Sequence, residues 1–423
     1  MTNVPSRTRI AVAGFVGTAI EFYDFYIYGT AAALVLNAAF FPEMDETAGR
    51  LAAFSTFAVA FLARPVGSAL FGHWGDRIGR KSMLVVSLLL MGLSTVAIGL
   101  LPGYAAIGVA APVLLVLLRF TQGIGLGGEW GGAALLATEH APPGRRGLYA
   151  MFPQLGPAVG FLAANGLFLV LGATLTDAEF GSWGWRLPFV ASLLLVLVGL
   201  YVRVRIAETP VFQQAMEQRR IARVPFAGLI RHQWRRVLLA AGAMTVTYTL
   251  FYTATTYCLA YGTATLGIPR TTMLALTMIA VVVMAAGIAG SALVSDRLGR
   301  RRTIMAGAVV AIGWGLVMFP LMETRSVALA GLSLTVALGV MGVIFGPMGA
   351  YLPELFRTEY RYSGASLAYS LGGVLGGAVP PLVATALQGS GAGTTAVGGY
   401  VSAMAVLSLL CLAALPETAG ESM

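Results

Sequence analysis

Charged residues are scarce in this chain of 423 residues, because Asp, Glu, Lys and Arg together make up only 11% of it. Soluble proteins carry about 25% charged residues, so a chain with so few cannot cover a water-facing surface. Hydrophobic residues make up 57% of the sequence. The composition therefore favours lipid over water as the surrounding solvent.

Cysteine is also scarce, since Cys258 and Cys411 are the two present and both lie in apolar runs. They provide neither a disulfide framework nor metal-site spacing, and we expect them to pack as small apolar residues. His73, His140 and His232 have no histidine partner one helical turn away, so no metal site is expected. The sequence also shows no nucleophile constellation and no phosphate-binding loop, and we do not expect an enzyme.

Long apolar segments take the place of charge. A membrane-spanning helix needs about 20 mostly apolar residues. The sequence predicts twelve such helices, at 11–36, 51–74, 82–101, 112–137, 148–173, 186–205, 237–260, 272–295, 303–322, 327–350, 363–388 and 395–414. We therefore expect an all-α membrane protein with a six-helix N-terminal half (1–205), a polar cytoplasmic linker (206–236) and a six-helix C-terminal half (237–423).

The net charge of +9 follows membrane topology and does not indicate nucleic acid. Most arginines outside the predicted spans fall on the side that also carries both termini. Cytoplasmic loops are enriched in Lys and Arg. We therefore expect a multi-pass protein of the plasma (inner) membrane with both termini in the cytoplasm.

A charged hinge occurs twice, as "DRIGRK" at 76–81 and as "DRLGRR" at 296–301. Each copy lies between the second and third predicted helices of its half, which indicates an internal duplication of the kind found in transporters. The glycine permits a tight turn, and the aspartate can pair with arginines or with the N-terminus of a neighbouring helix. The predicted gating residues are Asp76, Arg77, Gly79, Arg80, Asp296, Arg297, Gly299 and Arg300.

Five charged side chains fall well inside predicted spans, away from their ends, where a charge costs about 2.5–3.5 kcal/mol on insertion scales and is a functional candidate by default. Asp24 lies roughly 20 Å into the first helix, with Glu21 and Tyr28 on the same face. Asp24, Glu21 and Glu129 are the candidate proton-coupling residues. A fixed structural partnership between Asp24 and Arg119 is the alternative, and we expect Arg64 to line the inner gate.

The fourth predicted helix places Gln122, Glu129 and Trp130 near the face of Arg119. A guanidinium can bind a carboxylate through two parallel hydrogen bonds, so this face is a candidate substrate site. Hydrogen bonds between packed helices are the alternative for any single polar residue. The candidate substrate-binding residues are Arg119, Gln122, Trp130, Tyr28, Gln154, Asn165, Tyr248, Tyr252 and Tyr369.

The pattern G-x-G-x-x-G occurs at Gly123, Gly125 and Gly128. A dinucleotide site would need a strand before this pattern. Here the glycines lie inside a predicted membrane helix, and close helix packing is the better interpretation. The same interpretation applies to "GGVLGG" at 372–377.

Several stretches together resemble the major facilitator superfamily and, within it, the metabolite:proton symporters. They are the two hinges, "GTAIEFYDFYIYGTAAAL" at 17–34, "ARPVGSALFGHWGDRIGRK" at 63–81, "RFTQGIGLGGEWGGA" at 119–133, "SWGWRLPF" at 182–189, "AETPVF" at 207–212 and "YLPELFRTEYRYSGASLAYSLGGVLGG" at 351–377. The resemblance covers nearly the whole chain, and the first and last of the helical stretches resemble shikimate-type members most. The second hinge departs from the pattern, with Ala292 and Ser295 where the first has Gly72 and Gly75.

This resemblance implies a monomeric twelve-helix transporter in the lipid bilayer that takes up a small metabolite together with protons. The arginine of "RFTQG" is linked to proton coupling in the superfamily, and family substrates include shikimate, oxoglutarate, citrate, proline and betaine. The driving force is a proton gradient, and no cofactor is expected. Two alternatives stay open: a proton antiporter, because "LGPAVGF" at 155–161 partly resembles an antiporter motif, and a membrane sensor that transports nothing.

Overall fold

The computed structural model of this chain describes residues 7–78, 80–127, 130–139, 141–142, 144–205, 225–357 and 361–420. Side chains are described throughout these ranges except at 7–14, 72–78, 80–84, 136, 139, 202–205 and 225–227. This part of the chain is almost wholly helical and contains no strand. Ten of its helices are long and apolar enough to cross a membrane. The predicted all-α membrane fold is confirmed.

Helices of the N-terminal half coincide with the first six predicted segments. They are α1 (Arg7–Leu34), α3 (Glu46–Ile78), α4 (Arg80–Leu100), α6 (Ala110–Leu126) followed by α7 (Trp130–Glu139), α8 (Arg146–Thr174) and α10 (Leu187–Arg205). Short elements connect them: α2 (Leu36–Phe40), α5 (Tyr104–Ile107), α9 (Asp177–Ser182) and the 3-10 turn η1 (Gly184–Arg186). A Thr176–Glu179 capping box begins α9, as expected for a threonine followed three residues later by glutamate.

Helices of the C-terminal half coincide with the other six segments. They are α12 (Pro225–Tyr252), α13 (Cys258–Ala264), α14 (Arg270–Leu298), α15 (Arg300–Glu323), α16 (Val327–Glu354), α17 (Arg361–Gly373), α18 (Val379–Gly389) and α19 (Gly393–Ala413). Two π-helical turns, η2 (Thr253–Tyr257) and η4 (Val374–Ala378), join α12 to α13 and α17 to α18. α12 begins inside the predicted linker, and Gln233, with φ −131° and ψ 15°, separates its first turns from the spanning part.

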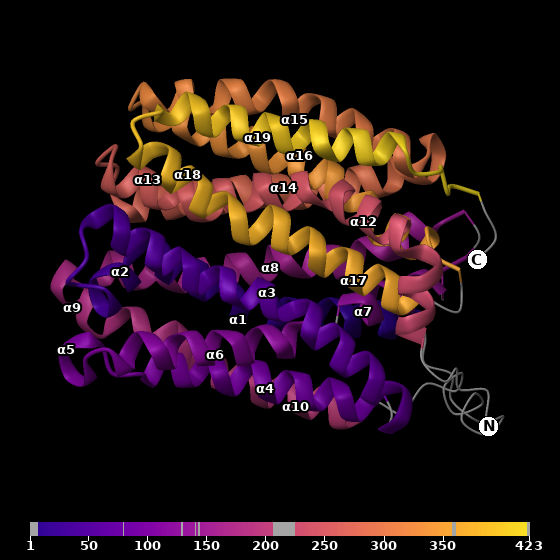
Figure 1. Ribbon diagram of the computed structural model, residues 1–423, viewed down its shortest axis with the longest axis horizontal. Coiled ribbons are helices and arrows are strands. Elements are labelled where there is room, and N and C mark those ends of the chain that lie inside the picture. Colours follow the sequence, from indigo (N-terminus) through magenta and orange to yellow (C-terminus); the bar gives the residue numbers. More distant parts are fainter. Residues whose placement is uncertain are drawn as a thin grey trace.

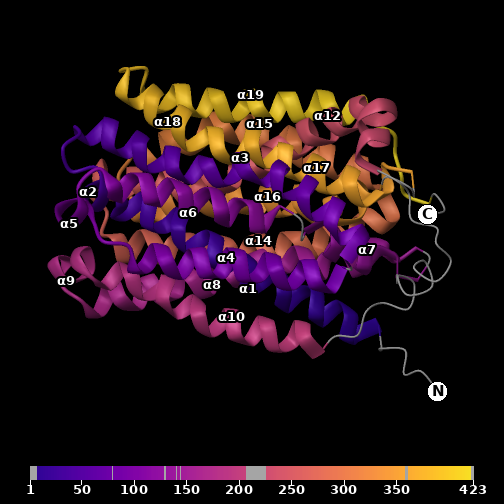
Figure 2. The same cartoon turned by 60° about the horizontal axis from the view of Figure 1, so that its bottom comes forward.

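The two halves lie side by side with their helices running in broadly the same direction (Figures 1 and 2). α1 begins and α19 ends at the same end of the bundle, which we call the termini end. Across the boundary, α8 packs against α14, and α3 packs against α17 and α18. These three contacts surround the space in which the polar candidates of the two halves can meet.

Large apolar side chains cover the outside of the bundle. Leu194 and Leu410 are 67% and 64% exposed, for example, whereas Asp24 and Arg119 are fully buried and Arg64 is 2% exposed. Soluble proteins rarely expose contiguous apolar surface of this kind. A chain with apolar residues outside and charges inside is suited to lipid, because each buried charge can find partners only within the protein.

Glycines of "GIGLGG" pack helices closely, as the sequence predicts. A Cβ atom on Gly123 would lie 2.2 Å from the carbonyl oxygen of Ala60 on α3, and one on Gly125 would lie 3.0 Å from the backbone of α4. Gly128 lies outside the described residues. The glycines therefore allow α3 and α4 to approach α6 closely enough to position Arg64 and Arg119 next to the same aromatic ring.

Candidate functional site

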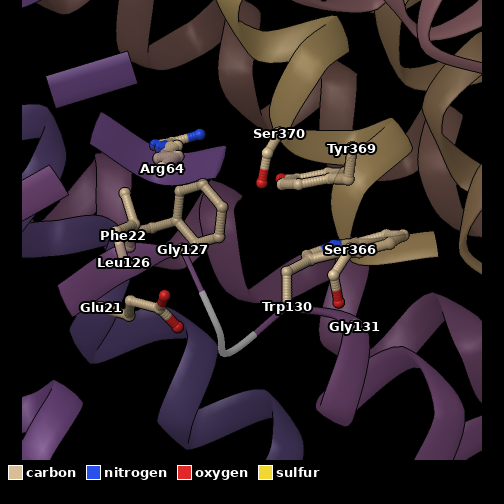
Figure 3. A pocket seen from close by; sticks show the side chains of 10 residues that line it. All are labelled: Glu21, Phe22, Arg64, Leu126, Gly127, Trp130, Gly131, Ser366, Tyr369 and Ser370. Carbon is tan, nitrogen blue, oxygen red and sulfur yellow. The ribbon is translucent and has the colours of Figure 1, made fainter. Parts of the chain in front are cut away.

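A small cavity lies between the two halves near the middle of the bundle, and we call it the central cavity. Its lining residues are Glu21, Phe22, Arg64, Leu126, Gly127, Trp130 and Gly131 from the N-terminal half, and Ser366, Tyr369 and Ser370 from α17. Figure 3 shows Arg64 and Glu21 on one side, facing Trp130 and Tyr369 on the other. Its free volume is close to that of one water molecule, so a larger molecule would fit only if the halves moved apart.

Arg64 lies near the middle of α3 and is enclosed by aromatic rings. Its guanidinium carbon is 4.4 Å from the centroid of the Phe25 ring and 4.5 Å from that of Phe61. Its Nε and Nη2 atoms are buried and have no hydrogen-bond partner. The sequence led us to expect Arg64 at the inner gate, but the structure places it in the wall of the central cavity.

A stacked pair of rings joins the halves beside this cavity. Trp130 of α7 and Tyr369 of α17 are parallel within 6°, with ring centroids 3.9 Å apart. Trp130 also donates a hydrogen bond to Oε1 of Gln154 (3.0 Å), and Gln154 donates to the carbonyl oxygen of Phe345 on α16 (2.9 Å). These three predicted site residues therefore form one connection across the boundary between the halves.

A second, apolar cavity adjoins the central cavity and shares Phe22 and Tyr369 with it. Its other lining residues are Tyr26, Pro157, Thr247, Tyr248, Phe251, Tyr252, Met284, Met341 and Phe345. Tyr248 and Tyr252 stack on each other at 6.2 Å, and Tyr252 also contacts Phe57 and Phe61 of α3 at 5.4 and 5.2 Å. The predicted tyrosines of α12 thus line a cavity and join it to the N-terminal half.

Arg119 lies in a separate buried polar cluster inside the N-terminal half. Its guanidinium donates to Oε1 of Gln122 and to the carbonyl oxygen of Phe57 (3.4 Å), and it lies 3.8 Å from the centroid of the Tyr28 ring. Gln122 in turn donates to the carbonyl oxygen of Asp24 (3.1 Å) and to Oγ1 of Thr95 (2.7 Å). This cluster joins α1, α3, α4 and α6 but does not line the central cavity.

Asp24 belongs to the same cluster but does not form the ion pair with Arg119 that the sequence led us to consider. Its Oδ1 accepts a hydrogen bond from Ser192 of α10, and its buried Oδ2 has no hydrogen-bond donor. In place of that alternative pairing, Gln122, one turn from Arg119, accepts a hydrogen bond from the guanidinium and donates one to the Asp24 backbone. Glu21, one turn before Asp24, faces the central cavity instead.

Tyr28 and Asn165 make contacts within the N-terminal half. The Tyr28 hydroxyl hydrogen-bonds Oγ1 of Thr56 at 2.5 Å, and Asn165 accepts from Thr30 at 2.7 Å and donates to the Phe161 carbonyl oxygen at 3.1 Å. Neither residue lines the two cavities described above. In this conformation both act as helix-packing residues. Glu129 lies outside the described residues.

The second hinge connects the halves at the termini end. Both carboxylate oxygens of Asp296 accept hydrogen bonds from the first backbone amides of α8, those of Gly147 (2.9 Å) and Leu148 (3.1 Å). A helix N-terminus attracts a carboxylate because its amides are free and its dipole is positive there. Arg300 pairs with Asp296 at 2.7 Å. Arg297 is exposed.

Sequence reasoning missed the partners that complete this connection. Glu354, at the end of α16, lies 3.6 Å from Arg146 of α8 and 3.5 Å from Arg300, so it joins both halves. Thr418 donates a hydrogen bond to Glu354 at 2.6 Å. Only the position of Glu354 at the end of an apolar segment could have indicated it, because spacing along the chain does not identify a partner more than 200 residues away.

Glu417, beyond α19, closes the hinge from the other side. Its carboxylate accepts from the backbone amide of Arg300 (2.8 Å) at the start of α15. Burial raises the pKa of Glu417, but hydrogen bonds from the amides of Ala419, Arg300, Arg301 and Thr418 outweigh burial and hold the pKa below its usual value. Gly299 has φ +104°, and a Cβ there would meet Glu417 at 2.6 Å, so this turn needs glycine.

For the first hinge, Gly79 and the side chains of Asp76, Arg77 and Arg80 lie outside the described residues. Its backbone resembles that of the second hinge, because α3 ends at Ile78 and α4 begins at Arg80, just as α14 ends at Leu298 and α15 begins at Arg300. The duplicated motif therefore interrupts the chain at the same point in both halves.

The opposite end of the bundle is also connected across the halves. Arg270, at the start of α14, pairs with Asp177 of α9 at 2.9 Å, and its guanidinium lies 4.0 Å from the centroid of the Phe180 ring. Asp177 is exposed, so this ion pair contributes little by itself. Together with the Phe57, Phe61 and Tyr252 contacts it closes that end. The described residues thus enclose the central cavity on both sides.

Gly147→Ala is expected to open the termini end. The added Cβ would lie 2.5 Å from the carbonyl oxygen of Ala292 and 2.7 Å from Nη1 of Arg300, so the Asp296 contact with α8 cannot close fully. We expect a cysteine placed at Ser366, in the wall of the central cavity, to react roughly tenfold faster with a maleimide, which corresponds to about 1.4 kcal/mol. The rate is measured above the background from Cys258 and Cys411.

The matched control is Gly290→Ala, since a Cβ at Gly290 on α14 has nothing within 4 Å. This variant should leave the labelling rate at Ser366→Cys unchanged. An unchanged rate in Gly147→Ala as well would show that the Asp296 contact does not limit access to the cavity.

Comparison with known proteins gives consistent matches along the chain. A model of the Major Facilitator Superfamily matches residues 14–381. The inner membrane metabolite transport protein YhjE of Escherichia coli is 50% identical over 427 residues, covering 100% of this chain and 97% of that protein. The shikimate transporter of Escherichia coli is 39% identical over 387 residues, covering 90% of this chain and 88% of that protein.

Among solved structures, the partially occluded inward-open conformation of the xylose transporter XylE from Escherichia coli matches with a TM-score of 0.78. The match covers 99% of both chains at 19% sequence identity. At that identity the likeness shows a shared fold. The relatives are named as transport proteins, and neither they nor the fold indicates an enzyme.

Proposed function

This chain belongs to the major facilitator superfamily, and from that premise we propose that it is a proton-coupled symporter that imports a small polar metabolite. It is a multi-pass membrane transporter. We place it in the inner membrane, with the termini end in the cytoplasm, because its relative YhjE is named for that membrane and because most of the described arginines lie at that end, as positive residues do on the cytoplasmic side.

One observation carries the proposal: the central cavity lies at the boundary of the two halves and holds a charge of each sign, Arg64 and Glu21. A site at the boundary of two repeats is the position that alternating access requires, because rocking the halves exposes it first to one side and then to the other. The contacts of Asp296 at one end and Arg270 at the other are then the two gates.

For the proton we propose Asp24, with Glu21 between it and the cavity. Oδ1 of Asp24 accepts a hydrogen bond from Ser192, whereas Oδ2 has no hydrogen-bond partner. A proton can therefore reside on Oδ2 without displacing an existing hydrogen bond. Glu21 is one turn away on the same helix and reaches the cavity. A shift of Asp24 on protonation would move Gln122 and, through it, Arg119. The contacts between α1, α3 and α6 would change as a result.

Uptake into proteoliposomes tests the proposal. Purified protein is reconstituted with an alkaline lumen, and labelled shikimate, L-proline, glycine betaine and 2-oxoglutarate are added outside. Accumulation above the outside concentration that a protonophore abolishes supports symport. Accumulation that instead requires an acidic lumen would indicate the antiporter. Absence of transport in either direction would favour the sensor.

A further inference from the structure

Arg64 is a buried cation whose hydrogen-bonding edge is unused. The side chain is 2% exposed, its Nε and Nη2 have no partner, and the rings of Phe25 and Phe61 hold it at 4.4 and 4.5 Å. Aromatic faces attract a guanidinium, but they do not replace its hydrogen bonds. A buried charge is stable in a protein when it is paired and hydrogen-bonded, so this edge is a position that an anion would complete.

We propose, on the basis of the transport function proposed above, that Arg64 binds the carboxylate of the substrate and that the substrate carries a single carboxylate. The Nε–H and one Nη–H of a guanidinium form a planar fork that matches the two oxygens of a carboxylate. The described charged side chains that line the cavity are Arg64 and Glu21. Among the described lining residues, a second carboxylate on the substrate would therefore find no second cation and would face Glu21.

Arg119, another buried arginine, is already engaged through its two terminal nitrogens, and only its Nε has no hydrogen-bond partner. It donates to Gln122 and to the Phe57 carbonyl oxygen, and it does not line the cavity. The Phe25 ring contacts both guanidinium groups, at 4.4 Å for Arg64 and 5.2 Å for Arg119. Arg119 therefore helps to hold the ring against which Arg64 lies, and we assign it a positioning role and Arg64 the direct contact.

The rest of the substrate has a defined place on the opposite wall. Ser366 and Ser370 of α17 present hydroxyl groups to the central cavity, and the Ser366 hydroxyl is buried without a hydrogen-bond partner. Tyr369 separates this polar space from the apolar cavity next to it. A carboxylate on Arg64, with hydroxyl or small apolar groups directed towards α17, would contact both halves and draw them together.

Comparing an acid with its amide tests the direct contact. The wild-type protein is titrated by calorimetry in detergent with shikimate, L-proline and glycine betaine, and with the carboxamide of whichever acid binds. We expect the acid to bind at least tenfold more tightly than its amide, about 1.4 kcal/mol. In Arg64→Gln we expect the acid and the amide to differ by less than threefold. A purely structural role for Arg64 would weaken both ligands alike and leave their ratio at the wild-type value, which would overturn the proposal.

Arg119→Gln separates direct contact from positioning, because it removes a buried guanidinium that does not line the cavity but touches the same Phe25 ring as Arg64. It should keep the tenfold ratio even if transport slows. If Arg64→Gln cannot be purified, Arg64→Lys is used, since lysine keeps the charge but lacks the fork, and an unchanged ratio there overturns the proposal equally. Binding of 2-oxoglutarate as tight as that of the single-carboxylate acids would overturn the selectivity.

These outcomes are separate from those of the proposed function. Proton-driven uptake with an acid-to-amide ratio that does not depend on Arg64 would leave the symporter intact and remove this inference. Binding that depends on Arg64 without proton-driven uptake would support this inference and contradict the proposed symport. No binding of any of the three acids to the wild-type protein would overturn the inference.

Discussion

Asp24→Asn is expected to abolish proton-driven accumulation of substrate while leaving exchange of labelled for unlabelled substrate intact. Asparagine resembles the protonated carboxyl group and can keep the contact that Asp24 makes with Ser192, but it cannot release a proton. Exchange requires the site to alternate without net proton movement, whereas accumulation requires a proton to be carried in each cycle. Accumulation should therefore fall to that of protein-free liposomes.

Both activities are measured on the same proteoliposomes, so that a difference in the amount of active protein cancels. Loss of exchange together with accumulation would make Asp24 structural. If Asp24→Asn retains both exchange and accumulation, the proton site is assigned to Glu21 or Glu129 instead. Glu21→Gln would then be expected to lose accumulation and keep exchange. The Ser192→Ala variant is informative as well, because it removes the hydrogen bond and keeps the carboxyl group.

Gly123→Val is expected to prevent the protein from folding. A Cβ at this position would lie 2.2 Å from the carbonyl oxygen and 2.8 Å from the carbonyl carbon of Ala60. Overpacking a close-packed contact costs about 1–3 kcal/mol, and here the obstacle is backbone, which cannot rotate away. We expect a cost at the top of that range or above it, seen as loss of the monodisperse peak in size-exclusion chromatography after detergent extraction.

Gly313→Val on α15 is the matched control, because Gly313 has nothing within 4 Å of its added Cβ and faces outward. It should give wild-type yield and a wild-type elution profile. A folded, active Gly123→Val protein would mean that α3 and α6 are not packed as closely as the structure shows, and the position of Arg64 would then need revision.

Much of the architecture could be predicted from the sequence because membrane helices are specified locally. Every predicted segment coincides with helices of the structure, since about 20 apolar residues in lipid have no other way to satisfy their backbone. The duplicated hinge indicated two halves because a repeated motif can be recognised in the sequence without knowledge of its contacts. The predicted segments were too short at several ends, as in α16, which continues to Glu354, because polar residues at helix ends interrupt the hydropathy pattern before the helix itself ends.

Partners of the buried charges could not be predicted, since a helical wheel gives the face of a residue but not the neighbour opposite it. A fixed partnership between Asp24 and Arg119 was the alternative to a proton-coupling role for Asp24. In the structure Gln122 lies between them, accepting a hydrogen bond from Arg119 and donating one to the backbone carbonyl oxygen of Asp24. Arg64, which precedes Pro65, was expected at the inner gate, but its place in the cavity wall depends on the packing of Phe25 and Phe61.

Contacts between helix ends that are far apart in the sequence could not be predicted either. Glu354, Arg146 and Glu417 surround the second hinge, and each comes from a different helix end. As single charges beside apolar segments they look like ordinary membrane-flanking residues. Their role becomes visible only when α8, α15 and α16 are brought together at the termini end.

Proton-coupled symport is tested most simply by the direction in which protons move when substrate enters. Proteoliposomes containing trapped pyranine, with equal pH on both sides and the membrane potential clamped by valinomycin and potassium, receive the acid identified in the uptake panel. For a proton symporter we expect the lumen to become more acidic as substrate enters, and we expect no pH change with Asp24→Asn. A lumen that becomes more alkaline in the wild-type protein would contradict symport, because protons would then be leaving as the substrate arrives.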